Sequence, residues 1–510
     1  MNRQERNGLA YDFSPFDGAP DKSSSDHPFS LDLDLFGEHS LFQSVNRTVT
    51  ALGRERLADW FLQPLSNKEE ICRRQEAIQE LAQRTTLRQH FYVTGIARPG
   101  SPNDLRLLEL LGRRENYFLG KPLWRLLVWI VPGLWLLLGV AAGMGWIGTS
   151  ALTTYFFISL IIANCRVKQI NALYQTVDKM EHIFHTYSDL MKSIEDSDQF
   201  QSDALKQIGR DLSNASEPAS RAIQRLSSYI DGLNQRFSLA GLIFNILYLR
   251  DTRHAIQLER WKERYAGQVG VWLEALARFD AYSSLGGYAF NHPDYIYPEI
   301  ADRYFQMKGK ALGHPLLDRR ICVRNDIEIQ ASPWFLIITG ANMAGKSTYL
   351  RTVGVNYLLA CIGAPVCADS LTVYPARLVT SLRTSDSLAS NESYFFAELK
   401  RLKMIIDSLQ NGEQLFIILD EILKGTNSVD KQKGSLALVK QLIAHDSCGI
   451  IATHDLILGT LADEFPEHIR NYRFEADIRN DELTFSYQLR EGIAQNMNAC
   501  FLMKKMGITV

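Results

Sequence analysis

The sequence has no excess of charge of either sign. Its 510 residues contain 55 Lys and Arg against 57 Asp and Glu, which leaves a formal net charge of −2. A protein that grips nucleic acid along much of its surface usually carries a clear basic excess. The composition therefore excludes an extensively basic surface, while a local basic patch stays compatible with it. A chain of this length predicts two or three domains.

The sequence also has few cysteines and no recognisable secretion signal. The seven cysteines are scattered and form no Cys-x-x-Cys pair, so neither a disulfide framework nor a zinc site is predicted. The first 30 residues are rich in Ser, Asp and Pro and lack an apolar run, so we expect no signal peptide. We expect a disordered or lead-in segment over residues 1–39, and the globular parts in a reducing cytoplasm.

One long segment lacks charge altogether. Residues 126–165 contain no Asp, Glu, Lys, Arg or His. These 40 residues exceed the ~20 that one bilayer crossing needs, and the small-residue stretch 143–148 divides them into two halves. We therefore predict a hairpin of two transmembrane helices over residues 121–168, embedded through residues 123–165. The alternative is a buried helical hairpin inside a large soluble domain.

Basic residues on both sides of this segment predict its orientation. They are Lys121, Arg125, Arg166 and Lys168. By the positive-inside rule both ends of the hairpin face the cytoplasm. We therefore expect the protein at the cytoplasmic membrane, with both termini and the C-terminal domain in the cytoplasm.

Helical spacing follows the hairpin. Apolar residues alternate four and three apart from Leu173 to Ile194 and again from Ile223 to Leu247, which predicts two helices paired as an antiparallel coiled coil. The connection 195–218 has six acidic residues and two strong cations, a balance that repels phosphate. We predict a helical lever over residues 169–305. Ordinary helix packing without a function of its own is the alternative.

A phosphate-binding pattern lies in the C-terminal third. The apolar run Trp334–Ile338 predicts a buried parallel strand, and residues 340–347 then fit GxxxxGK[ST] and lead into a helical pattern. Glycines let backbone N–H groups face phosphate, Lys346 reaches the β- and γ-phosphates, and Ser347 ligates Mg²⁺. The predicted nucleotide contacts are Gly340, Ala341, Asn342, Met343, Ala344, Gly345, Lys346, Ser347 and Thr348. The pattern predicts binding of ATP with Mg²⁺.

Two further apolar runs end in polar residues. Leu415–Leu419 leads to Asp420 and Glu421, and Gly449–Thr453 leads to His454. Asp420 is placed to hold hydrated Mg²⁺, Glu421 to orient or deprotonate the attacking water, and His454 to sense the γ-phosphate. With Asn342 of the loop, Glu421 and His454 are the candidate catalytic residues. Because parallel strands deliver such groups to one sheet edge, we predict an α/β P-loop ATPase domain over residues 306–510.

These motifs resemble a known family. TGANMAGKST, LDE at Leu419–Glu421, GTNSVD at Gly425–Asp430 and ATHD at Ala452–Asp455 are similar to the ABC-type ATPase domain of the MutS mismatch-repair proteins. Residues 385–398 resemble the signature segment of that domain, and Ser40–Leu81 resembles the start of the family's helical core, here placed at 40–120. The resemblance implies a homodimer joined through the ATPase domains. In it, Ser393 of one chain would contact the ATP of the other.

The sequence also departs from the family. Asn391 and Glu392 stand where the signature segment usually has glycine and often a basic residue, and Cys322 stands where an aromatic residue often stacks on adenine. Only about 40 residues precede the core, so we expect no mismatch-wedge domain, and we interpret Phe36-Gly37-Glu38 as part of the lead-in. DNA binding is therefore expected to be weak or non-specific.

Two hypotheses of function follow. The first is a membrane-tethered MutS-like ATPase related to DNA mismatch repair and DNA binding. The second is a membrane-anchored, ATP-driven conformational switch that acts on a protein or lipid partner.

Overall fold

The computed structural model describes residues 2–24, 26–97, 117–177, 181–213, 216–341, 343–383, 394–424, 427–479 and 482–495. Its contacts divide the chain into two compact units. Unit 1 comprises Met1–Arg47, Leu57–Gln83 and Tyr282–Val510, and unit 2 comprises Thr48–Arg56 and Arg84–Ala281. Two helices, α3 (Ala51–Leu62) and α14 (Arg250–Asn291), contribute residues to both units.

Unit 1 is built on a six-stranded sheet in the order β12-β9-β4-β8-β7-β6. The strands are β4 (Trp334–Gly340), β6 (Arg377–Ser381), β7 (Leu415–Asp420), β8 (Cys448–Thr453), β9 (Ile469–Phe474) and β12 (Arg490–Glu491). All neighbours pair in parallel except β12, which is antiparallel to β9. Nearly continuous apolar runs form β4, β7 and β8, as expected of strands covered on both faces.

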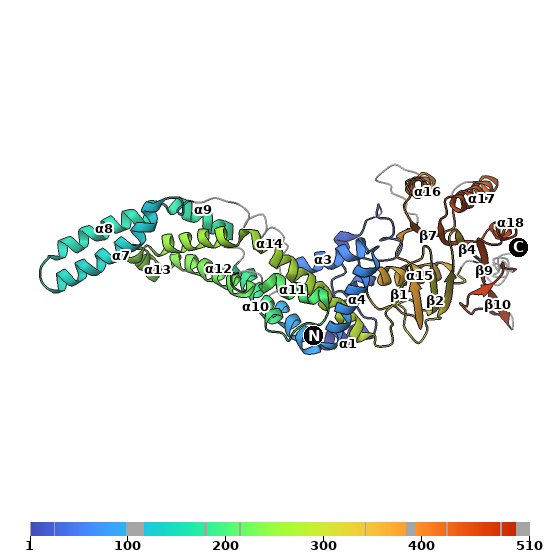
Figure 1. Ribbon diagram of the computed structural model, residues 1–510, viewed down its shortest axis with the longest axis horizontal. Coiled ribbons are helices and arrows are strands. Elements are labelled where there is room, and N and C mark those ends of the chain that lie inside the picture. Colours follow the sequence, from blue (N-terminus) through green and yellow to red (C-terminus); the bar gives the residue numbers. More distant parts are fainter. Residues whose placement is uncertain are drawn as a thin grey trace. The chain divides into compact units, whose positions relative to one another are not determined.

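Helices cover this sheet and complete the predicted α/β fold. They are α15 (Lys346–Cys361), α16 (Tyr394–Gln410), α17 (Ser428–Ala444), η5 (Leu456–Thr460) and α18 (Leu461–Glu464), shown in Figure 1. Unit 1 also contains a four-stranded sheet and a hairpin. The sheet has the order β1 (Glu299–Ile300), β5 (Ser370–Val373), β2 (Met307–Leu312) and β3 (Asn325–Ile329), and the hairpin pairs β10 (Ala476–Arg479) with β11 (Glu482–Phe485). Side chains of β4, β7 and β8 share one core cluster with α16 and α17.

The N-terminal segment, which we expected to be disordered or a lead-in to the core, contains helices where the structure describes it. It forms α1 (Asn2–Leu9), η1 (Pro20–Lys22) and α2 (Leu41–Val45), and α4 (Lys68–Gln83) follows in the same unit. Phe13, Phe16 and Phe29 are buried. The Ser, Asp and Pro content hid these widely spaced aromatic residues, each of which removes a large apolar area from water on folding.

Unit 2 is helical in its described part. Its helices are α5 (Thr85–Ile96), α7 (Pro122–Gly143), α8 (Thr149–Asn164), α9 (Val167–Val177), α10 (Glu181–Glu195), α11 (Asp203–Ser213), α12 (Ala219–Asn234), η4 (Gln235–Phe237) and α13 (Leu239–Tyr248). The predicted pairing holds for α10 and α12, which pack together. Their buried stripes are Phe184, Tyr187, Met191 and Ile194, and Ile223, Leu226, Ile230 and Leu233.

The predicted second stripe does not continue beyond α12. That helix ends at Asn234, and Phe244 of the separate helix α13 is 48% exposed. The side chains of Leu173, Val177 and Met180 lie outside the described part of the structure. The acidic connection contains α11, and Arg84 donates to the carbonyl oxygens of Asp198 (3.1 Å) and Gln199 (2.8 Å) within it.

The uncharged segment forms a helical hairpin. Helices α7 and α8 lie side by side at one end of unit 2, with α13 next to them (Figure 1). The indole N–H of Trp135 donates to Ser159 Oγ (3.1 Å), and the Tyr155 hydroxyl donates to the carbonyl of Val131 (2.9 Å). These polar groups of the uncharged segment therefore satisfy one another within the hairpin.

The prediction of two transmembrane helices was wrong in number. Only α7, with 22 residues and a mean hydropathy of 2.2, is long and apolar enough to cross a membrane by length and composition among the described residues. Helix α8 starts at Thr149, after the turn, and ends at Asn164, so it has 16 residues. At 1.5 Å per residue it extends about 24 Å, less than the ~30 Å hydrocarbon core of a bilayer.

Candidate nucleotide-binding site

The loop between β4 and α15 has the backbone of a phosphate-binding loop. Gly345 caps α15 with φ 107°, a left-handed conformation that favours glycine. A Cβ atom on Gly340 would lie 2.4 Å from the carbonyl oxygen of Phe474, so the strand end also requires glycine. The N-terminus of a 16-residue helix then points its free N–H groups into the site, which favours an anion there.

Lys346 lies inside this loop. Its ammonium group donates to the carbonyl oxygens of Gly340 (2.6 Å) and Ala341 (2.9 Å), and the residue is 5% exposed. Burial lowers the pKa of Lys346, and the nearby carboxylates of Asp420 and Glu421 oppose that shift. The ammonium group is thereby positioned beside the helix N-terminus, as the motif predicts.

Ser347 and Asp420 meet at the ends of α15 and β7. The Ser347 hydroxyl donates to Asp420 Oδ2 at 2.5 Å. Burial raises the pKa of Asp420, and the hydrogen bond from Ser347 opposes this. The other carboxylate oxygen, Oδ1, is buried and accepts no hydrogen bond from the residues that the structure describes. A hydroxyl, a carboxylate and an unsatisfied acceptor oxygen fit Mg²⁺, which prefers oxygen ligands.

Glu421 follows Asp420 and turns away from the strand with φ 54°. Its carboxylate lies 3.2 Å from Lys424 Nζ and 3.4 Å from His454 Nδ1. Burial is the largest influence and by itself raises the pKa of Glu421, but Lys424, His454 and Lys346 together outweigh it and lower the pKa. The carboxylate is therefore held ionised, the form that a general base requires.

Sequence reasoning missed two residues that support Glu421. Lys424 is the nearest cation to its carboxylate, and its i+3 spacing in the sequence was the available signal. The buried Glu398 of α16 accepts from the backbone N–H of Leu423 at 2.6 Å and so fixes the turn after Glu421. Burial also raises the pKa of Glu398. Only the fold brings α16 to this turn.

A cavity of about 410 Å³ opens beside the loop. Its lining includes the polar residues Lys346, Ser347 and Glu421 together with Ile321 and Tyr487. Cys322 also lines it, at the position where the family often has an aromatic residue. The carbonyl of Tyr487 accepts from Asn325 Nδ2 (3.0 Å), which ties this aromatic residue to the start of β3.

Most of the predicted site residues lie together. Ala341, Met343, Gly345, Lys346, Ser347, Thr348 and Glu421 line the cavity. Ala344 is buried within the loop, and His454 adjoins Glu421. Asn342 and Ser393, with the neighbouring Asn391 and Glu392, lie outside the described residues.

Comparison with protein-family models now identifies the chain. The model of MutS domain V matches residues 336–507, and that of MutS domain III matches residues 29–289, about half of the chain. The chain belongs to the MutS family. MutS domain V is a P-loop ATPase domain, in agreement with the sheet and the loop described above.

Curated relatives support the same assignment. The chain is 32% identical over 245 residues to the DNA mismatch repair protein MutS of Chloroflexus aurantiacus, covering 46% of this chain and 25% of that protein. It is 30% identical over 239 residues to the protein of the same name from Thermotoga maritima, covering 46% and 29%. The corresponding protein of Prochlorococcus marinus is 31% identical over 231 residues, covering 43% and 24%. The chain thus spans about a quarter of the length of the curated relatives it matches.

Proposed function

We propose that this MutS-family chain binds ATP with Mg²⁺ and hydrolyses it. The observation that carries the proposal is that Lys346, Ser347 and Glu421 line one cavity and that Ser347 is hydrogen-bonded to Asp420 beside it. In this function Lys346 binds the β- and γ-phosphates, and Ser347 and Asp420 hold Mg²⁺, which neutralises phosphate charge when bound. Glu421 orients the attacking water and accepts its proton, while His454 adjoins Glu421 and senses the γ-phosphate.

Adenine would contact apolar and aromatic residues that line the cavity. Tyr487 supplies an aromatic ring, and Ile321, 73% exposed, offers an apolar contact. Two chains would pair through their ATPase domains, with Ser393 of one chain completing the site of the other. The family resemblance supports this homodimer.

ATP turnover by the full chain, purified in detergent, tests the proposal. Glu421→Gln keeps the shape of the side chain but removes the base, so we expect turnover to fall about a hundredfold or more while ATP stays bound. Glu467→Gln, at an exposed position of the same unit, is the matched control and should turn over ATP normally. Full turnover by the Glu421→Gln protein would overturn the role of Glu421.

We also propose that the hairpin of α7 and α8 tethers the protein to the cytoplasmic membrane. Apolar side chains exposed on it include Leu136 (72%), Trp146 (77%) and Ile161 (70%). Exposure of this kind over a continuous uncharged segment suits lipid better than water.

Aromatic and basic residues at the base of the hairpin support the same proposal. The Arg166 guanidinium lies 5.8 Å from the Trp124 ring, and that of Arg253 lies 5.0 Å from the Trp129 ring. Trp and Arg together suit the headgroup level of a bilayer. Because the chain enters and leaves by this base, both termini and the ATPase domain lie on the cytoplasmic side in this proposal.

Membrane fractionation tests the tether. The intact chain should sediment with membranes, and a chain lacking residues 123–165 should not. An equally strong membrane association of the shortened chain would place the anchor elsewhere.

The target of the ATP cycle has two candidates. Family membership supports a relation to DNA mismatch repair, with DNA bound weakly or without sequence preference. The exposed apolar end of unit 2 favours the second candidate, an ATP-driven conformational switch that acts on a protein or lipid partner. Salt-dependent binding to matched, mismatched and branched DNA discriminates between them, because phosphate contacts appear in the salt slope.

A further inference from the structure

An N-terminal segment lies across the edge of the ATPase sheet. We call residues 27–34 the strap. The carbonyl oxygen of Pro28 accepts from the backbone N–H of Thr380 at 3.0 Å, on β6, the last strand of the six-stranded sheet. Leu33, 1% exposed, packs on Gly354 of α15, where a Cβ atom would lie 2.7 Å from Leu33 Cδ2. The strap thus contacts both the edge strand and the helix that follows the phosphate-binding loop.

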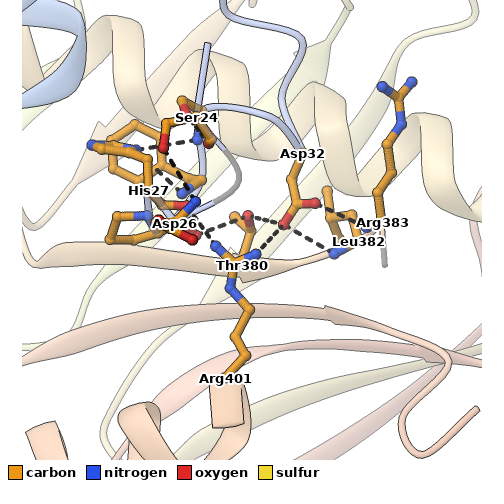
Figure 2. A network of polar contacts seen from close by, with 11 residues as sticks. Ser24, Asp26, His27, Asp32, Thr380, Leu382, Arg383 and Arg401 are labelled. Carbon is orange, nitrogen blue, oxygen red and sulfur yellow. Dashed lines mark hydrogen bonds and ion pairs between the residues drawn. The ribbon is translucent and has the colours of Figure 1, made fainter. Parts of the chain in front are cut away.

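Asp32 fixes the strap to the end of β6. Its carboxylate is 1% exposed and accepts from Thr380 Oγ1 (2.6 Å), Leu382 N (3.1 Å) and Arg383 N (2.9 Å). Figure 2 shows the carboxylate pointing into this group of donors, with Arg401 of α16 approaching it. Arg401 also donates to the carbonyl oxygen of His27. A buried carboxylate with three donors holds the backbone of residues 380–383 in one arrangement.

Asp34 connects two elements of the ATPase domain. Its Oδ2 accepts from Arg351 Nη1 (2.9 Å) on α15, five residues after Lys346. The same carboxylate accepts from both terminal nitrogens of Arg383, at 2.6 and 3.0 Å, two residues beyond the end of β6. One carboxylate therefore bridges the helix that carries the phosphate-binding lysine and the chain that leaves the neighbouring sheet edge.

We propose that Asp34 and the strap form a positioning device for ATP turnover. By joining Arg351 to Arg383, Asp34 fixes the position of α15 relative to the end of β6. A shift of either element on nucleotide binding would therefore move the other. The inference rests on the proposed ATPase function. Asp34 does not touch the nucleotide cavity, so it is a positioning residue. Because the pairs are partly exposed, their contribution to folding stability is small.

Asp34→Asn in the full chain is the direct test. Asp34 has φ 50°, a conformation that Asn tolerates, so the change removes charge with little backbone strain. We expect turnover to fall about tenfold, with ATP affinity changed less than about twofold and the thermal midpoint nearly unchanged. Asp12→Asn is the matched control, because Asp12 bonds the nearby Ser14 and Asn7.

Two further variants distinguish a positioning role of the strap in turnover from a purely structural role. Gly354→Ala displaces Leu33 without changing a charge and should lower turnover in the same way. Asp34→Glu keeps the carboxylate but tolerates φ 50° less well than Asp, and should recover part of the activity. Normal turnover by Asp34→Asn would overturn the proposal, and so would a parallel loss of turnover, ATP affinity and thermal midpoint, which would show a purely structural strap.

Hydrogen exchange tests the strap even if the intact chain turns over no ATP. Asp32 binds the amides of Leu382 and Arg383, and these amides should exchange faster in Asp34→Asn and Gly354→Ala than in the wild type. Unchanged exchange would overturn the strap itself. Absent turnover with changed exchange would instead overturn the proposed ATPase function alone.

Discussion

The two units of the chain expose different chemistry. In unit 1, polar side chains at the start of α15 and the end of β7, such as Lys346 and Asp420, lie beside the phosphate-binding loop, where each has a hydrogen-bond partner. In unit 2, α7 and α8 carry apolar side chains such as Leu136 outward, and the polar groups of the hairpin bond to each other. Unit 1 thus presents charged groups at the proposed nucleotide site, whereas the hairpin end of unit 2 presents apolar side chains.

The largest effect is expected at Lys346, where a substitution should change ATP binding by unit 1 and leave the proposed membrane contact of unit 2 unchanged. Lys346→Ala removes the charge that faces the β- and γ-phosphates, and we expect ATP affinity to fall about a thousandfold, or ~4 kcal/mol. Membrane association should stay unchanged, because the hairpin belongs to unit 2. Equilibrium binding of ATP and membrane fractionation of the same protein measure both. Lys440→Ala, which alters an exposed pair with Glu464 in unit 1, should leave both properties intact.

A substitution in the hairpin should have the opposite result, with membrane association changed and ATP turnover unchanged. Leu136→Arg places a charge on an exposed apolar position of α7, at a cost of about 2.5–3.5 kcal/mol in a bilayer, or roughly 70- to 400-fold in partitioning. ATP turnover in detergent should not change. Vesicle flotation measures the partitioning, and Val93→Arg, 55% exposed on α5 of the same unit, is the control. Equal flotation of both variants would contradict lipid contact at α7.

The sequence indicates which residues gather beside the loop, and the structure brings Lys346, Ser347 and Glu421 to one cavity, while the roles of these residues stay predictions. Apolar runs predict the buried parallel strands β4, β7 and β8. The loop follows the first of these strands, the carboxylates end or follow the second, and the histidine follows the third, so all three groups are expected at one edge of the sheet. The length of α8 could not be predicted in this way. Its first turn begins only at Thr149, and hydrophobicity does not report where a turn ends.

The strap escaped prediction for a different physical reason. Its apolar residues Phe29, Leu31 and Leu33 alternate with Ser and Asp, a period-2 pattern that predicts a strand, whereas the structure forms turns over residues 30–34. Asp32 and Asp34 also lie more than 300 positions away from their partners Arg383 and Arg351. Such long-range pairing follows from the tertiary fold alone.

A moderate effect is expected at Lys424, within the nucleotide site. Lys424 is the main opposing charge that lowers the pKa of Glu421, so Lys424→Met should raise that pKa. The acidic limb of the pH profile of kcat should then move to higher pH, because the base form of Glu421 is lost earlier as pH falls. We expect the deficit in turnover relative to wild type to be larger at acidic pH than near pH 8. An unshifted acidic limb would contradict the influence of Lys424 on the pKa of Glu421.

The smallest effect is expected for mismatched DNA. Sequence-independent affinity needs Lys and Arg that displace counterions, with log K falling by about 0.9 per neutralised phosphate as log salt rises. The net charge of −2 and the apolar hairpin end of unit 2 supply little of this. We therefore expect a G·T mismatch and a matched duplex to bind within about tenfold of each other, or ~1.4 kcal/mol, at physiological salt. A larger preference would contradict the contrast between the units, because it would require unit 2 to read DNA with a surface suited to lipid.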